Sequence, residues 1–292
     1  MGRDAPVLVV GAEGLLGGAV AACLAERGVE VLGTTRRPTA GLLPLDLAAA
    51  PSTWLLPERL QAAVLCAAVT STATCRSQPA AARRVNVDAT VELAGRLVAA
   101  GVRVVFPSTN QVFDGAAAHV PADAARCPRT EYGRMKAEAE VAILGLGTRA
   151  TVVRLTKIIH RGMPLFAGWR HALGRGQPVQ PFADLPLAPL TPGFAAAALV
   201  AALDRGTGGV IQVSATDDVT YADVALRMAH AAGQASGLVQ PVRAAAAGKE
   251  LEHVPLHTTL DTTTLRERLG LEPPGPWAAV DAICREQPSG RP

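Results

Sequence analysis

The sequence predicts an α/β fold built on a doubly wound parallel sheet, and three observations support this. A short apolar run at residues 7–10 leads directly into a glycine-rich turn and then a helical pattern. Apolar strands then alternate with helices over roughly 155 residues, as parallel sheets require. Polar residues follow several of these strands, at the sheet edge where open parallel sheets bind ligands.

The glycine-rich turn contains Gly11, Gly14 and Gly17 in a G-x-x-G-x-x-G spacing. We expect Gly11 to permit a tight turn, Gly14 the close approach of a pyrophosphate, and Gly17 close packing of the helix on the strand. The helix, closed by Gly28, would offer that phosphate unpaired N–H groups and a positive dipole end. The turn therefore predicts a dinucleotide site, with a purely structural turn as the alternative.

The second strand, expected at 29–33, is followed by Arg36 and Arg37 with no Asp or Glu at the strand end. An acidic residue there binds an adenosine ribose 2′-hydroxyl, whereas an arginine accepts a 2′-phosphate. The sequence therefore favours NADPH, with NADH as the alternative. Arg36 is the stronger candidate because Pro38 restricts the backbone of Arg37.

The remaining elements of the first half follow from shorter signals. A helix over 86–100 has Asn86 as a candidate N-cap and Gly101 at its end. The strand at 102–106 delivers Thr109 to the ligand-binding edge. Further strands are expected at 42–47, 63–68 and 150–155, and a polar helix at 57–62.

The composition changes after Lys157, because Pro and Gly become frequent through 161–192. We therefore predict a nucleotide-binding domain over 1–160 and a smaller α/β substrate-binding region over 161–292. Residues of about 192–213 are expected to return to the first domain. Helices are expected at 191–203, at 221–232 after a capping-box-like start, at 262–269 and at 277–284.

Composition excludes several classes of protein. A net charge of +3, evenly spread, does not suggest a nucleic-acid partner. Five cysteines without a C-x-x-C pair indicate neither a disulfide framework nor a zinc cluster, and Pro255 argues against a metal pair at His253 and His257. No signal sequence or membrane span is indicated, so a reducing, cytoplasmic setting is expected.

Tyr132 and Lys136 are four residues apart in a predicted helix, so both side chains can reach one site. The chain has only two tyrosines and three lysines, so chance gives such a pair with a probability of roughly 2 in 100. An adjacent ammonium would lower the pKa of the phenol toward working pH. Such a tyrosine can exchange a proton with a substrate oxygen. A solvated lysine beside a half-buried tyrosine is the alternative.

The chain resembles the extended short-chain dehydrogenase/reductases in the order of three features along the sequence: the glycine turn, the strand end at Thr109 and the Tyr132–Lys136 pair. The run 108–115 resembles the Ser-Thr-Asp-Tyr-Val-Phe-Asp-Gly run of the dTDP-4-dehydrorhamnose reductase group. The segments 66–70, 86–89 and 260–265, with Trp277 beyond, are also similar to that group. The resemblance spans almost the whole chain and is strongest before Lys136.

The resemblance implies a Rossmann fold and a cytoplasmic NAD(P)H-dependent reductase of a 4-keto sugar nucleotide. Tyr132 would donate a proton to the ketone oxygen, Thr109 would hydrogen-bond that oxygen, and Lys136 would hold the cofactor ribose. Further cofactor contacts are expected from Leu15, Asp46, Ala67 and Ala68, and substrate contacts from Asn110, Gln111, Val112 and Phe113. The expected partner is a small-molecule substrate, without metal, and a homodimer is compatible with the sequence.

Asn110 and Gln111 depart from the Asp and Tyr of that group. Both are neutral amides that hydrogen-bond but do not exchange protons at neutral pH. Carbonyl reduction remains feasible, whereas the Asp-Glu pair of the 4,6-dehydratases is absent, which argues against dehydration. Two alternatives stay open: a 4-epimerase with a retained cofactor, and a non-catalytic protein similar to the regulatory subunit of methionine adenosyltransferase.

Overall fold

The computed structural model describes residues 5–37, 39–49, 51–206, 208–247 and 251–285. Its centre is a seven-stranded sheet in which every neighbouring pair of strands is parallel. The strand order is β3 (Leu43–Pro44), β2 (Val31–Thr35), β1 (Val7–Val10), β4 (Ala62–Leu65), β5 (Arg103–Thr109), β6 (Ala150–Leu155) and β8 (Gly209–Val213). This sheet, covered by helices on both faces, confirms the predicted doubly wound fold.

The two faces of the sheet bury alternate residues of each strand, as the two-residue period of a strand requires. Val7 and Val9 of β1 pack with one group of helices, whereas Leu8 and Val10 pack with the other. The first group is α1 (Leu15–Glu26), α7 (Pro192–Arg205) and α9 (Thr263–Leu269); the second is α4 (Thr90–Ala99) and α5 (Glu131–Leu144). The short helices α2 (Thr72–Ser77) and α3 (Pro79–Arg83) pack beside α5.

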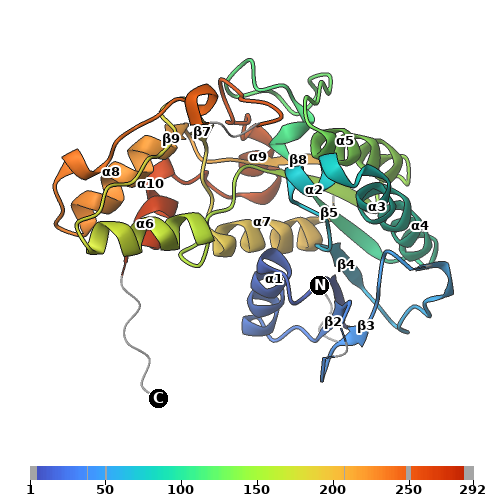
Figure 1. Cartoon of the computed structure of the whole chain (residues 1–292). Coiled ribbons are helices and arrows are strands. Elements are labelled where there is room, and N and C mark those ends of the chain that lie inside the picture. The colour runs from blue at the N-terminus through green and yellow to red at the C-terminus, as the bar shows by residue number, and fades with distance from the viewer. Residues whose placement is uncertain (1–4, 38, 50, 207, 248–250, 286–292) are drawn as a thin grey trace.

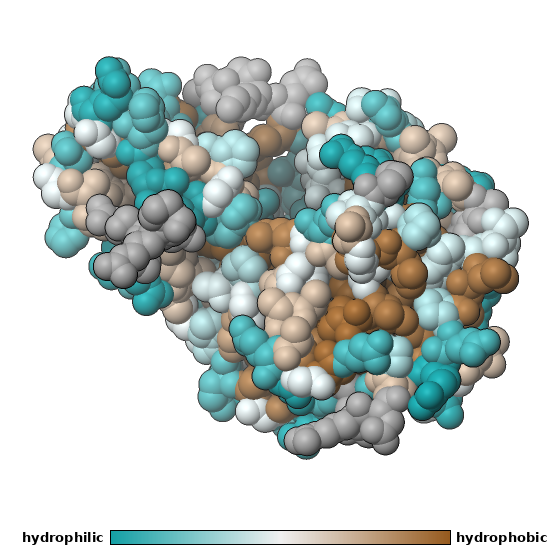
Figure 2. All heavy atoms as spheres, turned by 90° about the horizontal axis from the view of Figure 1, so that it is seen from below, coloured by the Kyte–Doolittle hydropathy of each residue, from teal (hydrophilic) through white to brown (hydrophobic). Residues whose placement is uncertain are grey.

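A second, smaller core lies beyond the sheet (Figure 1, left) and is built from α6 (Pro164–Gly174), α8 (Tyr221–Ala231) and α10 (Pro276–Cys284). Phe166, Trp169 and Tyr221 form an aromatic cluster within it, with ring centroids 5.6–6.3 Å apart. A two-stranded antiparallel ribbon, β7 (Pro186–Leu187) with β9 (Val219–Thr220), adjoins this core. Figure 2 shows a hollow between the smaller part and the larger one.

The chain crosses between these two parts more than once. After α6 and β7 it returns to the sheet as α7 and β8, and β8 pairs with β6 from Thr151↔Gly209 to Leu155↔Val213. Thr220 then starts α8 with a complete capping box with Asp223, as predicted. Among the described helices, none is long and apolar enough to span a membrane.

Most predicted elements are present, but two interpretations were wrong. The helix expected at 57–62 is absent, because Arg59 has φ of +59° and the chain enters β4 at Ala62. Asn86 is not an N-cap, because the backbone is already helical before it, through α3 and the π-helical stretch η2 (Arg84–Ala89). The amide of Asn86 instead donates to the Val69 carbonyl at 2.9 Å and accepts from the Val69 N–H at 2.8 Å.

Several strands differ from the prediction in length or position, and the one expected at 63–68 spans Ala62–Leu65. The strand expected at 42–47 is reduced to Leu43–Pro44, and Asp46 lies in the turn that follows. The second strand runs over Val31–Thr35 rather than 29–33, so Arg36 and Arg37 follow its last residue directly.

Candidate active site

A cavity of about 660 Å³ opens at the carboxyl ends of the parallel strands, where such sheets bind ligands. Its walls come from the glycine turn, the ends of β4, β5 and β6, the start of α5, the ribbon β7 and the segment 251–258. The predicted site residues that line it are Gly14, Leu15, Gly17, Ala68, Thr109, Asn110, Gln111, Phe113, Tyr132 and Lys136. Residues far apart in sequence thus meet in one cavity.

Six predicted site residues do not line the cavity. Gly11 lies in the turn against Ala67, and Arg36 and Arg37 are exposed beyond β2. Asp46 is also exposed, and its carboxylate accepts from the N–H of Ala48 at 2.9 Å.

Val112 is the sixth. Its side chain is fully buried in a core cluster with Leu260 and Ala137, so it cannot contact a ligand. We therefore leave Val112 out of the substrate site.

The glycine turn has little room for side chains. Gly11 has φ of +82°, and a Cβ on it would lie 2.9 Å from Ala67. A Cβ on Gly17 would overlap the Gly11 carbonyl oxygen, and one on Gly14 would lie 3.3 Å from it. Gly17 therefore lets α1 lie close to the backbone of Gly11, directly after the end of β1. Gly14 is the N-cap of α1 and faces the cavity.

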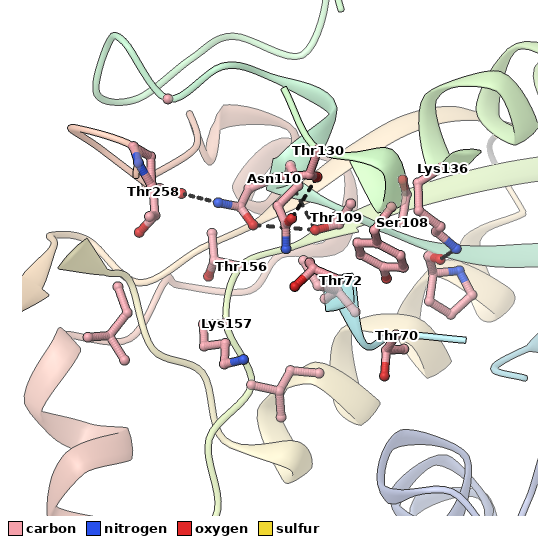
Figure 3. Close-up of a pocket in the computed structure, with 18 of the residues that line it drawn as sticks. Thr70, Thr72, Ser108, Thr109, Asn110, Thr130, Lys136, Thr156, Lys157 and Thr258 are labelled. Atoms are coloured by element: carbon pink, nitrogen blue, oxygen red, sulfur yellow. Dashed lines mark hydrogen bonds between the residues drawn. The ribbon is translucent and has the colours of Figure 1, made fainter. Parts of the chain in front are cut away.

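The end of β5 is joined to the start of α5 by side-chain hydrogen bonds (Figure 3). Thr109 Oγ1 accepts from the Gln111 N–H at 3.2 Å. The Thr130 hydroxyl donates to Gln111 Oε1 at 3.0 Å. The same hydroxyl caps α5, because it accepts from the Gly133 N–H at 3.0 Å. Asn110 Nδ2 donates to the Thr258 carbonyl at 3.3 Å. Asn110 and Gln111 thus line the cavity and also hold its walls together.

Gly133 brings α5 close to the turn that follows β5. A Cβ at this position would overlap the carbonyl oxygen of Gln111 and lie 3.0 Å from Thr130 Oγ1. Backbone therefore packs directly on backbone between Tyr132 and the residues that follow Thr109.

Lys136 is buried in the cavity wall, and its ammonium donates to the Pro107 carbonyl at 2.6 Å. Its Nζ also lies 3.7 Å from the centroid of the Phe106 ring. Burial lowers the pKa of Lys136 to about 7, although the charges of Glu140 and Cys66 oppose this change.

The expectation that Lys136 lowers the pKa of Tyr132 is wrong for this structure. Burial, with a smaller contribution from Cys75, raises the pKa of the Tyr132 phenol above its usual value. Lys136 does not contribute to this change, and its ammonium donates to the Pro107 carbonyl. Tyr132 therefore stays protonated and can act as a proton donor.

A buried ion cluster fixes α5 from behind. Glu140 and Arg154 are both almost fully buried and are 2.8 Å apart, and Arg126 contacts the same carboxylate at 2.7 Å. Burial opposes ionisation of Glu140, but the hydrogen bonds and charge of Arg154, with the hydrogen bond of Arg126, outweigh it and lower the pKa of Glu140. Arg154 lies in β6, so the cluster joins the helix of Tyr132 to the sheet.

Sequence reasoning missed two residues at the end of β6. Lys157 reaches into the cavity (Figure 3), where solvent can reach its side chain. The protein that surrounds the cavity still reduces the hydration of the ammonium, and this lowers the pKa of Lys157. Thr156 is only 4 % exposed, and its hydroxyl has no hydrogen-bond partner among the described residues. Their position directly after a predicted strand was the signal that could have identified them.

The described residues contain no group of three or more His, Cys, Asp and Glu that could hold a metal. His253 Nε2 contacts the Asp114 carbonyl at 2.6 Å, and His257 Nδ1 lies 3.5 Å from Asp218. These two histidines therefore have different partners.

Comparison with known proteins adds to this geometry. Residues 5–287 match the family described as RmlD substrate binding domain. A probable low-salt glycan biosynthesis reductase of Haloferax volcanii is 28% identical over 280 residues, which cover 91% of this chain and 93% of that one. A dTDP-4-keto-6-deoxy-D-glucose reductase of Streptomyces niveus is 30% identical and covers 94% of each chain.

Among solved structures, a dTDP-4-dehydrorhamnose reductase of Bacillus anthracis in complex with NADP is similar, with a TM-score of 0.83. The match covers 97% of this chain and 98% of that one at 18% identity, so it shows that the two proteins share a fold. Because the family match spans almost the whole chain, the protein belongs to the RmlD substrate binding domain family of extended short-chain dehydrogenase/reductases, the sugar-nucleotide reductases.

Proposed function

We propose that this protein is an NAD(P)H-dependent reductase of a 4-keto sugar nucleotide. The observation that carries the proposal is the single cavity on which the glycine turn, Thr109, Tyr132 and Lys136 converge. Its volume of about 660 Å³ is within the usual range for cofactor and ligand sites. The similarity to reductases of dTDP-linked keto sugars supports the same substrate class.

The residues present suit a dinucleotide. The turn at Gly14 leaves backbone N–H groups at the start of α1 without a side-chain cap, and the helix dipole there favours phosphate. Lys136 lies further along the cavity as a donor for a ribose hydroxyl. Arg36 and Arg37, beyond β2, favour NADPH through charge-assisted contacts to a 2′-phosphate.

The nicotinamide would supply a hydride to the carbonyl carbon of the sugar. Tyr132 would give its proton to the carbonyl oxygen, and Thr109 would hydrogen-bond the same oxygen. The raised pKa of Tyr132 keeps the phenol protonated before the reaction. The products are the hydroxy sugar, the oxidised cofactor and a tyrosinate that water reprotonates.

Lys157 and Thr156 would receive the substrate's diphosphate. Lys157 is a cation in the cavity with no carboxylate within ion-pair distance among the described residues, and Thr156 has a buried hydroxyl without a partner. An anionic, oxygen-rich group satisfies both. Asn110 and Gln111 would bind the sugar as neutral donors and acceptors, which fits reduction and gives no acid or base for dehydration.

We place this activity in the cytoplasm. All five cysteines are free thiols, as is usual in a reducing compartment. Thr109, Tyr132 and Lys136 of one chain line the same cavity, and a homodimer would be compatible with the proposed chemistry.

The direct test is oxidation of NADPH, followed by its absorbance, with dTDP-4-keto-6-deoxyglucose as substrate and NMR of the product. Consumption of one NADPH for each hydroxy sugar formed is the expected result. A protein that retains cofactor through purification and interconverts hydroxy sugars without consuming NADPH would be an epimerase instead. Binding of NADPH without either reaction would point to a regulatory protein.

A further inference from the structure

The side chain of Glu13 extends from the glycine turn to the region that follows β2. One carboxylate oxygen accepts a hydrogen bond from the hydroxyl of Thr35, and the other accepts from the hydroxyl of Thr39 at 3.0 Å. Thr35 is the last residue of β2. The carboxylate is thus held beside the place where Arg36 and Arg37 begin.

The backbone fixes this arrangement. The Gly11 N–H donates to Thr34 Oγ1 at 3.2 Å, and the Ala12 N–H donates to the Thr34 carbonyl at 3.0 Å. A Cβ on Gly33 would lie 2.8 Å from the Cβ of Ala12, so only glycine allows the turn to lie this close to β2. Glu13, the next residue along the turn, is therefore held beside the end of the strand.

Glu13 is an anion at this position. Its hydrogen bonds to Thr35 and Thr39 lower its pKa, and the charge of Arg37 adds to this effect. Two hydroxyls use only part of the accepting capacity of a carboxylate, which has about four lone-pair sites. The remaining sites can accept a further O–H donor.

The end of the second strand is where a dinucleotide-binding sheet meets the adenosine ribose. A free ribose 2′-hydroxyl is an O–H donor and suits Glu13. A 2′-phosphate carries a negative charge of about 1.5 to 2 and no comparable donor, so the same carboxylate repels it. Arg36 and Arg37 are exposed, have no ion-pair partner among the described residues, and act in the opposite sense.

We propose that Glu13 is a specificity-determining residue for the cofactor: it accepts the ribose 2′-hydroxyl of NADH and offsets the attraction of Arg36 and Arg37 for the 2′-phosphate of NADPH. This deepens the proposed function and rests on it, because it assigns the adenosine end of the same cofactor. The wild-type protein is accordingly a dual-cofactor enzyme with a modest preference for NADPH. The carboxylate for the ribose 2′-hydroxyl is thus supplied by the glycine turn, whereas the sequence pattern places it at the end of the second strand.

The test compares two ligands that differ only in the 2′-phosphate, adenosine 2′,5′-bisphosphate and 5′-AMP, by calorimetric titration. We expect Glu13→Gln to raise the ratio of the two affinities in favour of the bisphosphate by about tenfold to a hundredfold. Arg36→Ala should lower the ratio. Glu26→Gln is the matched control, because it removes the same charge from an exposed residue at the far end of α1 and should leave the ratio unchanged.

The same variants should shift the ratio of kcat/KM for NADPH and NADH in the same direction. An unchanged ratio in Glu13→Gln, with both nucleotides still bound, would overturn the role of Glu13 and leave the proposed function intact. Failure of both nucleotides and both cofactors to bind the wild-type protein would overturn the proposed function, and the role of Glu13 with it.

Discussion

The ammonium of Lys136 donates a hydrogen bond to the backbone carbonyl of Pro107, two residues before Thr109 on β5. This contact joins the helix of Tyr132 to the strand of Thr109 through a buried cation. The ammonium of Lys136 therefore joins α5 to β5 in the free protein, and it is also a candidate cofactor ligand.

The first prediction concerns stability and pH. The pKa of Lys136 falls from 10.5 in the unfolded chain to about 7 in the folded one. Between these values the unfolded state binds more protons, so this residue makes the free energy of unfolding rise with pH. We expect urea unfolding of the cofactor-free protein to show a gain of about 2 kcal/mol between pH 7 and 9 from this group.

Lys136→Met should remove that gain and weaken cofactor binding. Tyr132→Phe is the control, because it keeps Lys136 and should retain the dependence on pH. A free energy of unfolding that has the same pH dependence in Lys136→Met and wild type would contradict the assignment.

The second prediction concerns proton donation. Tyr132→Phe removes only the hydroxyl, so cofactor affinity should persist while turnover falls by about 10²-fold or more. Tyr221→Phe is a matched control, because Tyr221 lines the same cavity but packs against Phe166 and Trp169. Equal turnover in the two variants would exclude Tyr132 as the acid.

The third prediction concerns the diphosphate. Lys157→Met should raise KM for the sugar nucleotide by about tenfold or more, because a charge-assisted hydrogen bond is lost. Cofactor affinity should not change, and Lys157→Arg should recover part of the loss. If KM is unaffected and the salt dependence of KM is that of the wild type, Lys157 does not contact the substrate.

The fourth prediction concerns the contact of Gly133 with the Gln111 carbonyl. Gly133→Ala forces α5 away from Gln111 in the turn after β5, and overpacking of this kind costs about 1–3 kcal/mol. Both thermal stability and turnover should fall. Gly168→Ala, in α6 with open space around the added methyl, should instead stabilise the protein by about 0.5–1 kcal/mol. Similar changes in melting temperature for the two variants would argue against the close contact.

The fifth prediction concerns the buried ion cluster. Arg154→Met leaves the carboxylate of Glu140 with only Arg126, and removal of one partner from a buried pair costs about 3–5 kcal/mol. The lowered pKa of Glu140 means that its stabilising contribution is present above about pH 4.5 and is lost as the pH falls through its folded value. The variant should therefore lose less stability than the wild type on acidification, as measured by urea unfolding at pH 7 and 4.

Local patterns in the sequence were sufficient for the sheet and for the convergence of Thr109, Tyr132 and Lys136. Each of these residues follows a short apolar strand or has helical spacing, and parallel topology brings strand ends together. Side-chain direction was not predictable in this way. The four-residue spacing places Lys136 on the face of Tyr132, but the carbonyl of Pro107, distant in sequence, determines where its ammonium points.

Two other errors have the same origin. Asn86 looked like a cap because helix starts are judged from local sequence, whereas its partner, Val69, comes from another loop. Glu13, which we propose as the carboxylate for a 2′-hydroxyl, was not predicted because the sequence pattern places such a residue after the second strand. It reaches that place through hydrogen bonds between the turn and the strand end.

The pairing of Asn86 with Val69 has a consequence for how this cavity can change. One amide side chain supplies the donor and the acceptor that a neighbouring strand would give, so the hydrogen bonds that hold the loop after β4 to Asn86 use only the main-chain atoms of Val69. The side chains of Ala68 and Thr70, which line the cavity, are left out of that anchorage. Substitutions at these two positions can reshape the wall without displacing it, which makes this loop a favourable place to alter ligand preference while retaining the fold.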